Sequence, residues 1–126
     1  MRQVILLLLG LAVGAIAAAN IGAALRQRDA YPRGLMQVMQ HDLGRLRDAA
    51  RSSRCDAGAA TTLQQLRGLS GQIESAVYAN AAPEAAFVKY AQRLRTALPA
   101  AVDCKTLAAA IERTDSACDA CHRQYR

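Results

Sequence analysis

Residues 118–126 read CDACHRQYR, and the spacing of Cys118, Cys121 and His122 guides the interpretation of the whole chain. A Cys-x-x-Cys-His sequence is typical of covalent attachment of c-type haem. Each thiol can add through sulfur to one haem vinyl group, and the adjacent imidazole can ligate the iron. On a helix, positions i, i+3 and i+4 share one face. The motif therefore predicts one haem c, held by two thioethers and by His122.

Other kinds of site also use closely spaced cysteines. A thioredoxin-like pair lies near a strand–helix junction, and this chain has no strand-rich segment. A structural zinc site needs a fourth ligand, and His41 is the only other histidine. A simple disulfide would leave His122 without a role. A thiol redox pair at Cys118 and Cys121 remains as the alternative to haem attachment.

The N-terminal segment predicts export. Arg2 precedes an apolar run that ends in the small residues 17–19. We expect residues 1–19 to be a cleaved signal peptide. An uncleaved anchor reaching about residue 25 is the alternative, because no charge interrupts residues 3–25. Either way the remainder enters the periplasm, attached to the inner membrane if the segment is retained. Thioethers and disulfides are both plausible in such an oxidising compartment.

Composition indicates one small domain, which we place at residues 26–126. Aromatic residues make up 4% of the chain and tryptophan is absent. A core so poor in large side chains would be marginal alone, and a buried porphyrin would supply apolar bulk. The net charge of +6 suggests acidic partners or solubility alone. Because no basic patch is interleaved with aromatic residues, we do not expect nucleic-acid binding.

The helical spacing of apolar residues in 26–126 predicts an all-α fold of four amphipathic helices. The first spans about residues 29–51, with Pro32 in its first turn. The next two span about residues 59–78 and 83–98, and Asp103 can cap the fourth, which carries the motif. Short connections between such helices imply an antiparallel up-down four-helix bundle.

This topology brings the start of the first helix to the end that holds the motif. Met36 and Met39 lie on its inward face, whereas His41 is expected to point outward. Methionine sulfur occurs with histidine as an iron ligand in electron-transfer cytochromes. Met36 is therefore a candidate sixth ligand, and its alternative role is core packing, which is common for methionine at helical spacing.

The two ends of the chain resemble the cytochrome c′ family, a group of four-helix-bundle haem proteins. Cys118, Cys121, His122, Tyr125 and Arg126 match the family's C-terminal pattern without a gap. The stretch YPRGLMQVMQHDLGR at residues 31–45 resembles its opening helix. The middle helices match only by their pattern.

The resemblance implies roles for individual residues. Met36 falls at the family's distal position, where methionine implies a six-coordinate, low-spin haem and leucine a five-coordinate haem open to gases. Arg126 corresponds to a basic residue near the proximal histidine. Pro32 stands where the family often has an arginine near a haem propionate. The family also forms homodimers through its first two helices.

Cys55 and Cys104 lie outside the motif. In an up-down bundle, the first loop and the start of the fourth helix share the end opposite the motif. A Cys55–Cys104 disulfide is therefore expected, and closing this loop would stabilise the fold by roughly 4 kcal/mol. The alternative is two unpaired thiols.

Three classes of function follow from these features. The first is one-electron carriage between redox partner proteins, with His122 proximal and Met36 distal. The second is binding of small gases such as NO or CO at a five-coordinate iron. The third is a non-haem thiol redox protein. No paired carboxylates, nucleophile–base pair or phosphate loop stands out, so we do not expect an enzyme.

Overall fold

The computed structural model describes residues 2–125, and of residues 25–28 it describes the backbone alone. Throughout the described range all regular secondary structure is α-helical, which confirms the all-α class. The chain divides into two compact units, Met1–Arg33 and Gly34–Arg126.

Helix α1 spans Arg2–Arg51 without a break. The expectation that the first domain helix begins near Asp29, with Pro32 in its first turn, is wrong, because Pro32 lies inside α1. A proline inside a helix removes one backbone donor and is usually disruptive. Here the strong helix-forming leucines and alanines before it continue the helix on its N-terminal side.

The part of α1 in the first unit carries exposed apolar side chains. Its residues include Val4, Ile5, Leu8 and Leu11, each more than half exposed. By length and composition this part of α1 could cross a membrane, and a signal sequence has the same properties.

Helix α1 ends in a turn that positions Cys55. The Ser53 amide donates to the Ala50 carbonyl over 3.3 Å, and the Arg54 amide donates to the Ala49 carbonyl over 2.9 Å. This is the hydrogen-bond pattern of a Schellman motif, whose left-handed position usually holds glycine. Ser53 occupies that position with φ of 52°.

The second expected helix, residues 59–78, is divided in the structure. Helix α2 spans Ala57–Ser70 and the short helix α3 spans Ile73–Val77. Asp56 caps α2 by accepting a hydrogen bond from the Ala59 amide. Gly71 closes α2, and glycine weakens a helix interior through its conformational freedom.

The last two helices agree closely with expectation. Helix α4 spans Ala85–Ala97 and helix α5 spans Cys104–Gln124. The Asp103 side chain accepts a hydrogen bond from the Lys105 amide over 3.0 Å, so the expected cap is confirmed.

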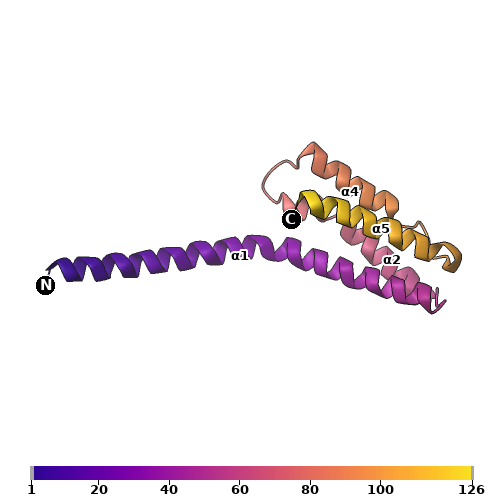
Figure 1. Ribbon diagram of the computed structural model, residues 1–126, viewed down its shortest axis with the longest axis horizontal. Coiled ribbons are helices and arrows are strands. Elements are labelled where there is room, and N and C mark those ends of the chain that lie inside the picture. The colour runs from indigo at the N-terminus through magenta and orange to yellow at the C-terminus, as the bar shows by residue number, and fades with distance from the viewer. Residues whose placement is uncertain (1, 126) are drawn as a thin grey trace. The chain divides into compact units, whose positions relative to one another are not determined.

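Within the second unit, neighbouring helices run antiparallel (Figure 1). Arg47 near the end of α1 pairs with Asp115 of α5, and beyond it Cys55 is bonded to Cys104. Tyr125, which follows α5, is hydrogen-bonded to Glu84 before α4. From Arg47 to Cys55 the chain advances while the partner positions on α5 go back from Asp115 to Cys104, so α1 and α5 run in opposite directions.

One apolar core lies between these helices. Leu46, Leu66 and Leu107 are its most deeply buried leucines. The other large members are Leu35, Met39, Leu43, Leu63, Ile73, Phe87, Leu94, Leu98 and Ile111. Every helix from the second part of α1 to α5 contributes to it, so the motif-bearing α5 is held by packing along its length.

Candidate haem-attachment site

The motif occupies the last turns of α5. Cys118, Cys121 and His122 are all half-buried, as expected for three residues that share one face of the helix. Neither thiol is in a disulfide. Cys118 and Cys121 both pack against the apolar core. The structure thus offers two unpaired sulfurs and an imidazole at the edge of an apolar interior.

Burial controls the protonation of these thiols. Burial, reinforced by the nearby Asp115 and Asp119 carboxylates and by Cys121, raises the pKa of the Cys118 thiol to about 11. Burial also raises the pKa of Cys121. Both groups are therefore thiols at neutral pH, and a thiol is a much poorer nucleophile than a thiolate.

The two methionines of the first domain helix differ in exposure. Met36 is half-buried and packs against the same core as Cys118 and Cys121. Met39 is buried within that core. His41 is exposed, as the sequence predicts. Met36 therefore has the partial exposure of the motif residues, whereas Met39 is a packing residue.

A cluster of aromatic rings lies beside the motif. Phe87 contacts both Tyr78 and Tyr125 edge to face, each with a centroid separation of 5.0 Å. Tyr90 contacts Tyr125 at 5.9 Å. Four of the five aromatic residues of the chain thus gather here. Sequence reasoning missed this cluster, although an antiparallel arrangement of helices would bring these positions to one end.

Tyr125 links the motif to this cluster. Its amide donates to the Cys121 carbonyl over 2.9 Å, and its hydroxyl donates to Glu84 Oε2 over 3.2 Å. Desolvation, followed by this hydrogen bond, raises the pKa of the Tyr125 hydroxyl. The last turn of α5 is therefore fixed to the start of α4.

Cys55 and Cys104 form the disulfide expected from the sequence. Their Cα atoms lie 5.7 Å apart, within the usual range for a disulfide. The bond joins the chain after α1 to the first residue of α5. It therefore ties α1 to α5 at the end of α5 that is remote from the motif.

An ion pair lies between the disulfide and the motif. Arg47 Nη2 of α1 is 2.6 Å from Asp115 Oδ2 of α5, and both side chains are partly exposed. No residue pattern predicts this pair, because it depends on the register of the two helices. It holds α1 beside α5 one turn before Cys118.

Asp42 is a buried carboxylate on the inward side of α1. Its exposure is 2%, and its Oδ2 atom has no hydrogen-bond partner among the described residues. Burying an unsatisfied polar oxygen is costly. The position is therefore a weak point in the core between Met39 and Leu46.

No protein-family model, curated protein sequence or solved structure matches this chain. The resemblance to cytochromes c′ therefore depends on the terminal motif and the first domain helix alone. Of the residues that carry it, Arg126 lies outside the described range.

The residues present fit a covalently bound haem. The two thiols needed for thioethers are unpaired and separate from the structural disulfide. His122 is beside Cys121 and offers an imidazole nitrogen, while Met36, which packs against the same core as the two cysteines, offers a thioether sulfur. This donor set suits haem iron, for which histidine with methionine is a known ligand pair.

Proposed function

We propose that this protein is an exported mono-haem cytochrome that carries single electrons between redox partner proteins. The observation that carries the proposal is the unpaired Cys118 and Cys121 beside His122, half-buried against an apolar core. Haem c, when bound, supplies an iron that accepts and releases one electron.

We infer that the second unit is a four-helix bundle around this haem, with α2 and α3 together forming one of its four members. The antiparallel pairs formed by Arg47 with Asp115 and by Tyr125 with Glu84 support that topology. The packing of Met36 against the core shared with Cys118 and Cys121 supports a distal role for its sulfur. Met36 as ligand would favour a low-spin carrier over a gas-binding protein.

The raised thiol pKa values count against thiol redox exchange. Redox-active cysteines usually have a lowered pKa and reactive thiolates. The pKa of Cys118 is instead raised to about 11, mainly by burial. Apolar surroundings that suppress the thiolate are also the surroundings that a porphyrin ring would occupy.

The apolar N-terminal part of α1 supports export to the periplasm. A retained segment would tether the cytochrome domain to the inner membrane, and a cleaved one would release it. The resemblance to cytochromes c′ adds a homodimer as the expected assembly.

The decisive experiment compares two double variants of the full chain, each produced in the periplasm with haem-maturation machinery. Cys118→Ala/Cys121→Ala is expected to lack covalently bound haem. Cys55→Ala/Cys104→Ala removes the same number of sulfurs and is expected to retain it. Mass spectrometry of the denatured proteins and the Soret absorption band measure the difference.

Each outcome separates the functional classes. Wild-type protein without a Soret band would contradict the proposal and favour a thiol protein. A haem-loaded protein whose reduced spectrum is unchanged by carbon monoxide supports the electron carrier. A high-spin spectrum that changes with carbon monoxide would favour gas binding instead.

A further inference from the structure

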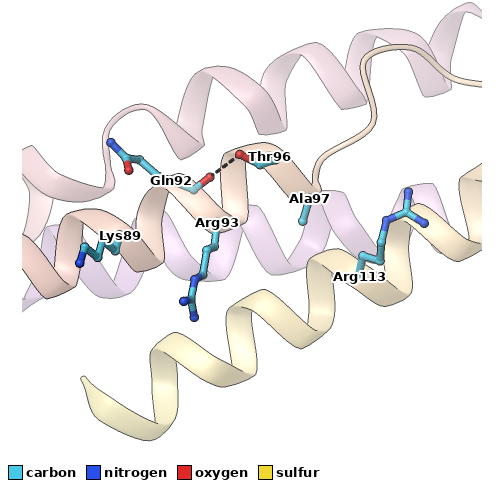
Figure 2. Close-up of a pocket in the computed structure, with 6 residues that line it drawn as sticks. All are labelled: Lys89, Gln92, Arg93, Thr96, Ala97 and Arg113. Carbon is cyan, nitrogen blue, oxygen red and sulfur yellow. Dashed lines mark hydrogen bonds between the residues drawn. The ribbon is translucent and has the colours of Figure 1, made fainter.

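A groove lies between α4 and α5, with a volume of about 600 Å³ (Figure 2). Figure 2 shows Arg93 extending from α4 toward α5, and Arg113 rising from α5 on the side of Ala97 that faces away from Arg93. The lining holds three basic side chains, two polar ones and one alanine, with no carboxylate: Lys89, Arg93, Arg113, Gln92, Thr96 and Ala97.

None of the three cations of this groove takes part in an ion pair with another described residue. In the described part of the chain, the ion pairs between side chains use Arg33, Arg47, Arg51 and Arg95. Lys89, Arg93 and Arg113 take part in none of them. The groove therefore concentrates uncompensated positive charge, whereas several other arginines are matched with carboxylates.

The groove is connected to the motif through two tyrosines. The Arg93 guanidinium carbon lies 5.6 Å from the centre of the Tyr90 ring, a cation–π contact. The Tyr90 ring contacts Tyr125, whose amide donates to the Cys121 carbonyl. A molecule held by Arg93 would therefore lie close to the end of α5 that carries the motif.

The shape of the groove suits a macromolecular surface. All its lining residues except Ala97 are exposed. Sites for small ligands usually enclose most of the ligand. Exposed cations on flexible side chains instead attract carboxylates on an opposing protein and accelerate encounter through long-range charge.

We propose that this basic groove docks the acidic surface of a protein redox partner beside the haem motif. The redox part of this inference rests on the proposed electron-carrier function. Lys89, Arg93 and Arg113 attract carboxylates of the partner, and the contact of Arg93 with Tyr90 brings this charge close to the motif. The interaction weakens as salt concentration rises, because exposed charges are screened.

The test uses the full-length protein, whether or not it holds haem, and a fluorescein-labelled peptide of glutamate residues as an acidic probe. The groove variant is Lys89→Gln/Arg93→Gln/Arg113→Gln. The control variant, Arg45→Gln/Arg54→Gln/Lys105→Gln, removes the same charge from exposed positions outside the groove that take part in none of these ion pairs. Fluorescence polarisation at low salt is expected to show binding about ten-fold weaker for the groove variant, and little change for the control.

Equal weakening in both variants would overturn the proposal, because net charge alone would then explain binding. Unchanged binding in the groove variant would overturn it as well. Displacement of the peptide by inorganic phosphate at constant ionic strength would identify a phosphate site instead. Arg93→Lys/Arg113→Lys keeps the charge and is expected to retain binding, which separates lost charge from lost folding.

A second measurement tests the proximity of the groove to the haem. Oxidation of the reduced protein by anionic ferricyanide is expected to slow in the groove variant, and oxidation by cationic hexaammineruthenium to accelerate. Equal rates for the groove and control variants would contradict that proximity. Absence of haem from the wild-type spectrum would overturn the proposed function and its redox role, whereas the peptide assay judges the groove itself.

Discussion

The hydroxyl of Tyr125 lies 3.2 Å from Glu84 Oε2, so the residue that follows α5 is bonded to the residue that precedes α4. Tyr125 is also three positions after His122. Its ring packs against Phe87 and Tyr90. The end of the helix that would carry the haem is therefore fixed by one hydrogen bond and two ring contacts, although it lies near the end of the described chain.

Tyr125→Phe is expected to lower stability and to change its alkaline pH dependence. The pKa of Tyr125 is raised in the folded protein by desolvation and by Glu84. The unfolded chain therefore loses this proton first as pH rises. The stabilisation that the protonated Tyr125 hydroxyl gives to the folded protein is complete below the ordinary pKa of 10.0. It is lost as pH rises through the higher pKa of the folded protein. Thermal unfolding between neutral and alkaline pH measures this loss of stability.

Tyr90→Phe is the control for this prediction. An identical pH profile for both variants would contradict the role of Glu84.

Met36→Ala is expected to convert a low-spin haem spectrum to a high-spin spectrum that responds to carbon monoxide. The reason is loss of the only sulfur ligand that we assign to the distal side. Met39→Ala provides the matched control, because Met39 is buried in the core. It is expected to lower the free energy of unfolding by roughly 3 kcal/mol and to leave the spin state unchanged. A spin change in Met39→Ala alone would show that the ligand is assigned to the wrong methionine.

Acidification is expected to weaken the contact between α3 and α4. Arg95 donates to both oxygens of Glu74, over 2.9 Å and 2.7 Å, and lowers the pKa of Glu74. The stabilisation that the ionised Glu74 gives to the folded protein is complete above the ordinary pKa of 4.5. It is lost as pH falls through the lower pKa of Glu74 in the folded protein.

Glu74→Gln is therefore expected to cost about 1 kcal/mol at neutral pH and to reduce the loss of stability on acidification. Urea unfolding at a series of acidic pH values measures both effects. Glu112→Gln changes an exposed glutamate of α5 and serves as the control. Parallel acid profiles for wild type and Glu74→Gln would contradict this role of the ion pair.

Loss of the disulfide is expected to reduce stability without removing the haem. Cys55→Ser/Cys104→Ser removes a cross-link between residues 49 positions apart in the sequence. The free energy of unfolding is expected to fall by about 2–4 kcal/mol. Denaturant unfolding with and without reductant measures the effect. If reductant destabilised the wild type and the double variant equally, the disulfide could not be the cause.

In protein produced without haem, the motif thiols are expected to react slowly with iodoacetamide near neutral pH. The pKa of Cys118 is raised to about 11, so little thiolate is present. Alkylation followed by mass spectrometry gives the rate, with urea-unfolded protein as the reference. Faster reaction in the folded than in the unfolded protein would favour the thiol redox alternative.

Local signals predicted much of this molecule. The motif spacing, the Asp103 cap and the Cys55–Cys104 pairing follow from residue type and helical periodicity. The continuation of α1 through Pro32 does not, because sequence rules treat proline as a helix boundary. The Arg47–Asp115 pair and the aromatic cluster were also missed. Both depend on the register between helices, which the sequence pattern leaves open.

The positions of the four cysteines have a consequence for maturation. Four cysteines allow three disulfide pairings, but Cys104 and Cys118 are fourteen residues apart on α5, a separation of about 21 Å along its axis. Disulfide formation requires Cα atoms within about 7 Å. A folded chain can therefore oxidise Cys55 with Cys104 without drawing on the motif thiols. Folding therefore keeps the structural disulfide separate from the motif, so that closing the Cys55–Cys104 bond leaves both motif sulfurs free of cross-linking to the rest of the domain.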